Sequence, residues 1–151
     1  MKTLLPVVLA SSILNLAALA QRLERINPKE LSTPQTYSHV VKAGNLLFIA
    51  GQVGISSDGK LKGPGMVEQL DQALSNLQAA LRSQRADFRH VAKITIFTTS
   101  IAEFRSREAA DVRARYFGEN KPASTLVQIQ QLASPEYKVE IEAVAVIEGG
   151  V

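Results

Sequence analysis

The sequence predicts an α+β protein with the element order β-β-α-β-α-β and with its helices over one face of the sheet. Three observations support this fold class. Leucines recur at helical spacing between Met66 and Leu81, β-branched residues cluster in VAKITIFT, and apolar side chains alternate along KVEIEAVAV. A chain of 151 residues with these elements is expected to form one compact domain.

Ordered structure is expected to begin near Tyr37. The segment before it, residues 21–35, is polar and contains two prolines, so it is interpreted as a lead-in outside the core. Two short apolar stretches follow in TYSHVVKAGNLLFIAGQVGI and meet at Ala43-Gly44-Asn45. Because Gly44 and Asn45 tolerate positive φ, the two stretches are predicted to form a β-hairpin.

Two amphipathic helices are predicted, one on each side of the buried strand VAKITIFT. The apolar stripe of the first consists of Leu70, Leu74, Leu77 and Leu81. The second is expected to begin at Ser100, which forms an S-x-x-E capping box with Glu103. Its apolar stripe consists of Phe104, Val112 and Tyr116.

The chain is expected to finish in β structure, with a strand opened by Ser124 in KPASTLVQIQ and a last strand in YKVEIEAVAVIE. Along the last strand one set of alternating positions is wholly apolar and the other is half apolar, ending in Val144 and Val146. A strand with two apolar faces needs a covering on both sides, and the helices supply only one. We therefore expect an oligomer.

Residues 1–20 resemble a secretory signal peptide. Lys2 precedes an apolar run that ends in Ala18-Leu19-Ala20, the small-x-small pattern at which signal peptidases cut. A membrane anchor is the alternative, but Pro6 and Asn15 interrupt the run. The expected protein is exported, periplasmic or secreted, and is free of the membrane after cleavage.

Composition excludes several kinds of chemistry. The chain has no cysteine, so thiol nucleophiles and thiolate metal sites are ruled out, and the net charge of +3 is too small to indicate nucleic acid binding. His39 and His90 lack partners at metal-ligand spacing and are interpreted as two partly exposed polar residues. No metal and no cofactor are expected.

Five segments, in order from Thr36 to Ile147, resemble the RidA/YjgF family of enamine and imine deaminases, whose older label is L-PSP endoribonuclease. The segments are TYSHVVKAGNLLFIAGQVG, QALSNLQAAL, HVAKITIFTTSIAEF, KPAST and KVEIEAVAV. The resemblance implies a RidA-like domain over residues 36–151 with a chorismate-mutase-like fold. It also implies a homotrimer with small-molecule clefts between neighbouring subunits.

The resemblance also implies which residues form the site. Glu140 and Tyr37 correspond to catalytic positions, and the substrate-binding positions are Ala50, Gly51, Gln52, Ser124 and Leu126. Deaminating members have arginine where this chain has Ser124, and that arginine pairs with the substrate carboxylate. A hydroxyl offers one neutral hydrogen bond in place of a charged, bidentate pair. Ala50 and Leu126 make the implied cleft more apolar than that of the family.

Several interpretations of these residues stay open. Glu140 is either a proton carrier or a polar group on an interface strand, and Tyr37 is either a catalytic hydroxyl or an aromatic side chain buried at a subunit junction. Arg113 or Lys121 could replace the missing guanidinium. As a whole, the protein is a metal-free imine deaminase or a trimeric binder of a small, largely neutral ligand. A ribonuclease has only the older family label in its favour.

Overall fold

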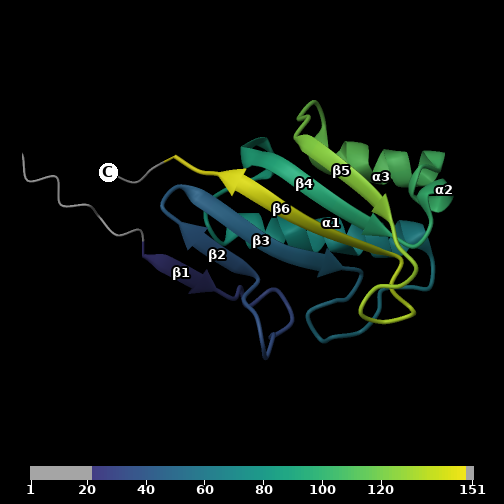
Figure 1. Ribbon diagram of the computed structural model, residues 1–151, viewed down its shortest axis with the longest axis horizontal. Coiled ribbons are helices and arrows are strands. Elements are labelled where there is room, and N and C mark those ends of the chain that lie inside the picture. The colour runs from purple at the N-terminus through teal and green to yellow at the C-terminus, as the bar shows by residue number, and fades with distance from the viewer. Residues whose placement is uncertain (1–21, 149–151) are drawn as a thin grey trace, which may run out of the picture.

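The computed structural model describes residues 22–148, and the predicted signal segment 1–20 lies outside them. Within this range the strands form one six-stranded sheet in the order β1-β2-β3-β6-β4-β5 (Figure 1). Its strands are β1 (Leu23–Ile26), β2 (Val40–Ala43), β3 (Leu46–Val53), β4 (Val91–Thr98), β5 (Ala123–Gln128) and β6 (Val139–Val146). Only β4 and β5 pair in parallel. No helix within residues 22–148 has the length and apolar character needed to cross a membrane.

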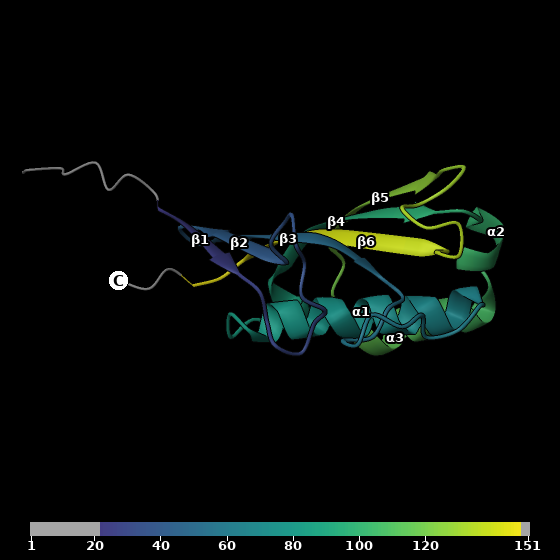
Figure 2. The same ribbon diagram turned by 90° about the horizontal axis from the view of Figure 1, so that it is seen from below.

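The main helices lie together on one side of the sheet (Figure 2). They are α1 (Met66–Arg82) and α3 (Arg107–Phe117), with a short α2 (Ile101–Phe104) before α3 and a 3₁₀ turn, η1 (Phe88–His90), before β4. The four leucines predicted for the stripe of α1 are fully buried against the sheet. This confirms both the α+β class and the placement of the helices on one face.

Three details of the predicted organisation are wrong. The polar segment before Tyr37 contributes the edge strand β1, and its Leu31 is buried in the core. The sheet has six strands within residues 22–148, one more than the five predicted strand segments, and the order β-β-α-β-α-β left out the predicted strand opened by Ser124, which is β5. The second predicted helix is divided, because Ser106 caps a new helix through its side chain and the amide of Ala109. Ser100 caps α2 as expected, because its hydroxyl accepts from the backbone amide of Glu103. The other half of the capping box does not form, since the backbone amide of Ser100 donates to the hydroxyl of Thr98 and not to the Glu103 side chain.

The hairpin and the last strand follow the prediction. β2 and β3 pair around a turn in which Gly44 has a φ of 61°, a conformation that glycine adopts readily. On β6, the residues Val139, Ile141, Ala143 and Ala145 face the helices and are buried. The alternate residues face the open side of the sheet, where Val146 and Phe48 of β3 are exposed.

A register shift in β3 positions the site. Ile49 pairs with Ala143 and Gln52 pairs with Ile141, so Ala50 and Gly51 form a β-bulge opposite β6. Asn76 of α1 fixes the end of this strand, because its side-chain amide donates to the carbonyls of Val53 (3.1 Å) and Ile55 (2.8 Å). The bulge is therefore held from the sheet and from the helix layer.

Candidate functional site

Glu140 packs directly on the backbone of Gly51. A Cβ atom built on Gly51 would lie 2.6 Å from Cδ and 2.8 Å from Cγ of Glu140, far inside van der Waals contact. Only glycine leaves room for the carboxylate at this place. The bulge in β3 and the absence of a side chain at position 51 thus create the seat in which Glu140 lies.

The carboxyl group of Glu140 is held partly out of water. Burial raises its pKa, and the negative charge of Glu142 on the same strand raises it further. A raised pKa brings a carboxyl group closer to the range in which it can both accept and donate a proton near neutral pH. Glu140 is therefore a candidate for a general acid-base group.

Tyr37 stands beside this carboxyl group. Its side chain is 52% exposed, and its pKa is raised by partial burial, then by the charge of Glu140 and by Tyr137. The ring of Tyr37 meets the ring of His39 edge-on, with centroids 5.5 Å apart. The structure thus brings together the two residues predicted to be catalytic, and it leaves the tyrosine hydroxyl accessible.

His39 is buried, which corrects the expectation of a partly exposed residue. It is 3% exposed because both ring nitrogens and its backbone have partners inside the fold. Nε2 lies 2.7 Å from the carbonyl oxygen of Ser32, and Nδ1 lies 3.3 Å from Nε2 of Gln52. Gln52 is also buried, and its Nε2 donates to the carbonyl of Ala50. Gln52 thus supports the bulge from behind.

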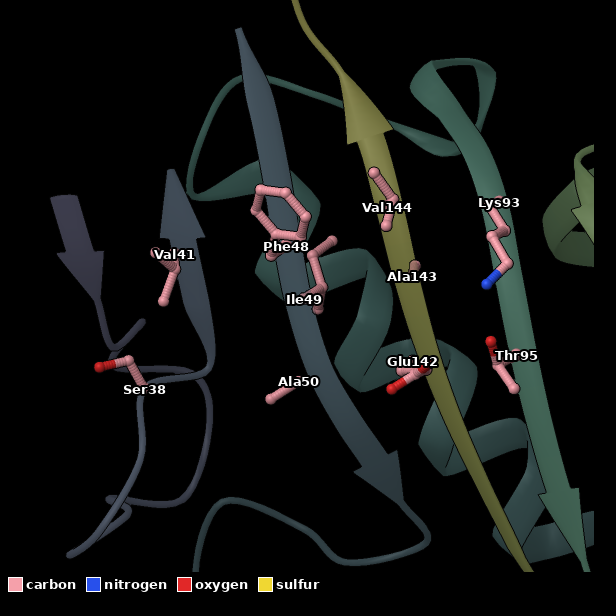
Figure 3. A pocket seen from close by; sticks show the side chains of 10 residues that line it. All are labelled: Ser38, Val41, Phe48, Ile49, Ala50, Lys93, Thr95, Glu142, Ala143 and Val144. Atoms are coloured by element: carbon pink, nitrogen blue, oxygen red, sulfur yellow. The ribbon is translucent and has the colours of Figure 1, made fainter. Parts of the chain in front are cut away.

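Ala50 lines a cavity of about 310 Å³ on the open face of the sheet. One side of this cavity is apolar, with Val41, Phe48 and Val144. The other is polar, and Figure 3 shows Lys93 and Thr95 of β4 close to Glu142 of β6. None of these three polar residues was predicted, although their outward positions on alternating strands were a usable signal.

The remaining predicted site residues lie away from Glu140 within one chain. Ser124 is exposed on the edge strand β5, in register with Ile94, and β4 separates it from β6. Leu126, in register with Ile96, packs against the hydrophobic core. A single chain therefore does not bring Ser124 or Leu126 together with Glu140.

The two candidate replacements for a guanidinium differ in their surroundings. Arg113 lies over the ring of Phe104, 4.3 Å from its centroid, and donates to the carbonyl of the same residue. It is thus engaged within the helix layer. Lys121 is exposed just before β5. Within residues 22–148 no three His, Asp or Glu side chains form a cluster suited to a metal ion.

Taken together, the fold and site define a class of protein: an α+β sheet with helices on one face and a half-buried carboxyl group seated on a glycine of the central strands. Family comparison places the chain more narrowly. Residues 28–147 match the family model described as Endoribonuclease L-PSP. The chain belongs to this family, which confirms the resemblance to RidA/YjgF proteins.

Individual relatives agree with this assignment. A RutC family protein of Pyrococcus horikoshii is 36% identical over 110 residues, which cover 72% of this chain and 85% of the relative. A protein of Homo sapiens named 2-iminobutanoate/2-iminopropanoate deaminase is 33% identical over 111 residues, covering 73% and 79% of the two chains. The crystal structure of a putative endoribonuclease from Thermotoga maritima, 34% identical, aligns with a TM-score of 0.74 over 83% of this chain and all of that one.

The seat of Glu140 can be tested by replacing Gly51 with alanine. The added methyl group must displace the carboxylate, so we expect Gly51→Ala to lower the free energy of unfolding by about 1 to 3 kcal/mol, the usual cost of overpacking. Urea denaturation measures this change. The matched control is the same substitution in Glu140→Ala, where the cost should largely vanish. An equal loss in both backgrounds would show that Glu140 does not occupy this seat.

Proposed function

We propose that the protein is a hydrolytic deaminase that converts an imine and water into a carbonyl compound and ammonia. The observation that carries this proposal is the half-buried carboxyl group of Glu140 beside the accessible hydroxyl of Tyr37. Support comes also from the relatives, among which the Homo sapiens protein is named as an imine deaminase.

The chemistry requires one group that both accepts and returns protons. Glu140 takes a proton from water while the water oxygen bonds to the imine carbon. The same carboxyl group passes this proton to nitrogen, which gives a carbinolamine. It then moves the hydroxyl proton to nitrogen as the carbonyl forms, so that the carbon–nitrogen bond breaks and ammonia leaves. The pKa of Glu140 is raised by burial and by Glu142, which favours both steps because a less acidic carboxylate is a stronger base toward water. The hydroxyl of Tyr37 orients the water or the substrate nitrogen.

The substrate class follows from Ser124. Deaminating relatives are expected to carry an arginine at this position. The Ser124 hydroxyl cannot form the charged, bidentate pair that an arginine forms with a carboxylate. Without the charged pair, the binding free energy of a carboxylate substrate is weaker by on the order of 1.5 to 3 kcal/mol, which is about a ten- to hundredfold loss of affinity. The proposed substrates are therefore imines with little or no negative charge. A protein that binds such molecules without turnover is the second candidate, and the same serine favours it.

The site is proposed to be completed by assembly into a homotrimer. The open face of the sheet exposes Phe48 (46%) and Val146, which a monomer would leave in water. The charged Lys93 and Glu142 on the same face form no ion pair within residues 22–148. A second copy can cover the apolar groups and supply opposite charges. It can also bring its own β5, with Ser124, toward Glu140.

The mature protein is proposed to act outside the cytoplasm, after loss of residues 1–20.

Replacing Ser124 with arginine tests the substrate assignment. Ser124→Arg should increase hydrolysis of 2-iminopropanoate by about ten- to a hundredfold, because the guanidinium group adds a charged, bidentate pair with the substrate carboxylate. Glu140→Gln should abolish activity in either background. Ammonia release from freshly generated imine is the readout, and the double variant is measured beside both single variants. No gain in Ser124→Arg, with its side chain in the cleft of a determined structure, would favour the binder over the enzyme.

Light scattering of the chain lacking residues 1–20 tests the assembly. The expected mass is three times that of the monomer. Phe48→Glu places a charge on the proposed contact face and should shift the population to monomers, whereas Leu23→Glu, which changes an exposed residue of the edge strand β1, should not. A monomeric unmodified protein at micromolar concentration would refute both the trimer and a site shared between subunits.

A further inference from the structure

A second, much smaller cavity lies behind the seat of Glu140. Its volume is about 20 Å³, enough for one water molecule and too small for an organic substrate. Among the residues that line it are Tyr37, His39, Gly51, Gln52 and Asn76. It thus borders the glycine on which Glu140 rests and the tyrosine that stands beside that carboxyl group.

The orientation of the Gln52 side chain follows from its partners. The carbonyl of Ser32 can only accept, so Nε2 of His39 carries a proton. The carbonyl of Ala50 can likewise only accept, so the Gln52 atom beside it is the amide nitrogen. Gln52 must therefore present its amide nitrogen to His39, and the second hydrogen of that nitrogen goes to the carbonyl of Ala50 at 2.9 Å. Both donors of Gln52 are used, and only its oxygen is left.

That oxygen, Oε1 of Gln52, has no hydrogen-bond partner among residues 22–148. Gln52 is only 2% exposed. Within the described part of the chain, every side-chain oxygen that is completely inaccessible to solvent has a hydrogen-bond partner. Oε1 therefore borders open space, and the space that Gln52 lines is this cavity. A buried acceptor beside a water-sized cavity calls for an occupant that donates hydrogen bonds.

Asn76 lines the same cavity and carries a second acceptor. Its amide nitrogen donates to the carbonyls of Val53 and Ile55, and its oxygen accepts one bond from Gln72. An amide oxygen has two lone pairs, so one of them is still available. Two acceptors and a volume of about 20 Å³ match the two hydrogens and the size of one water molecule.

We propose that this cavity binds one water molecule, held by Gln52 and Asn76, and that it supplies the water consumed by the deaminase reaction. The second half of this inference rests on the proposed function. In each turnover the stored water moves past Gly51 to Glu140, loses a proton to the carboxyl group and bonds to the imine carbon. Solvent then refills the cavity. His39 is a positioning residue, because it directs the amide oxygen of Gln52 away from itself.

The experiment compares crystal structures and kinetics of the unmodified protein, Gln52→Met and Gln78→Met. The unmodified protein should show an ordered water about 2.7 to 3.2 Å from Oε1 of Gln52. Gln52→Met removes the acceptor at nearly equal length, so the water should be lost. With the contact between Glu140 and Gly51 unchanged in the crystal structure of this variant, kcat should still fall about tenfold with KM unchanged. Gln78→Met changes a glutamine of α1 that does not line the cavity, and it should keep both the water and kcat.

Each outcome decides between the two halves of the inference. A well-resolved structure of the unmodified protein without this water would overturn the binding site, whatever happens to Gln52→Met. Unchanged kcat after loss of the water would overturn its role as a supply. A bound water in a protein that hydrolyses no imine would support the binding site and refute the supply role together with the proposed function. If Gln52→Met does not fold, Gln52→Asn, which keeps the amide but withdraws its oxygen, replaces it.

Discussion

The contact between the carboxyl group of Glu140 and the bare backbone of Gly51 is the constraint on which the site depends. It requires three features at once: a bulge in β3, a glycine in that bulge and β6 as the neighbouring strand. Without the bulge the strands would pair in an unbroken register and present a different residue to Glu140. With any side chain at position 51, the carboxyl group would be pushed toward water and its pKa would fall toward the ordinary value.

The bulge is supported by buried polar side chains on the helix side of the sheet. Gln52 and His39 hold it from behind, and Asn76 fixes the strand just beyond it. Buried polar groups of this kind are stable only when they are paired, so the side chains tolerate few rearrangements. This rigidity keeps Glu140 and Tyr37 in one arrangement, while the open face of the sheet stays available for the second copy proposed above.

The parts of the fold that could be predicted are those fixed by local periodicity. The stripe of α1 and the two-sided pattern of β6 follow from the residues themselves. β1 was missed because Leu23–Ile26 is a short, mostly exposed edge strand whose pairing with β2 no local pattern specifies. The division of α2 from α3 depends on Ser106, a cap inside an otherwise continuous helical pattern.

The site shows the same limit. Glu140 and Tyr37 were predicted by resemblance, but their environment depends on the register between strands far apart in the sequence. The burial of His39 was missed because its partners, Ser32 and Gln52, lie in a segment taken for a lead-in and in the bulge. The small cavity is likewise a product of tertiary packing and leaves no sequence pattern.

The most direct test of the account is the titration of the Glu140 carboxyl group, followed by carbon-detected NMR in the unmodified protein and in Glu142→Gln. We expect a midpoint above the ordinary 4.5 in the unmodified protein, and a lower one in the variant, because the neighbouring negative charge is gone. Since the fold favours the protonated carboxyl group, its ionisation should also cost stability as the pH rises through that midpoint. A midpoint at or below 4.5 in the unmodified protein would contradict the assignment of Glu140 as the proton carrier.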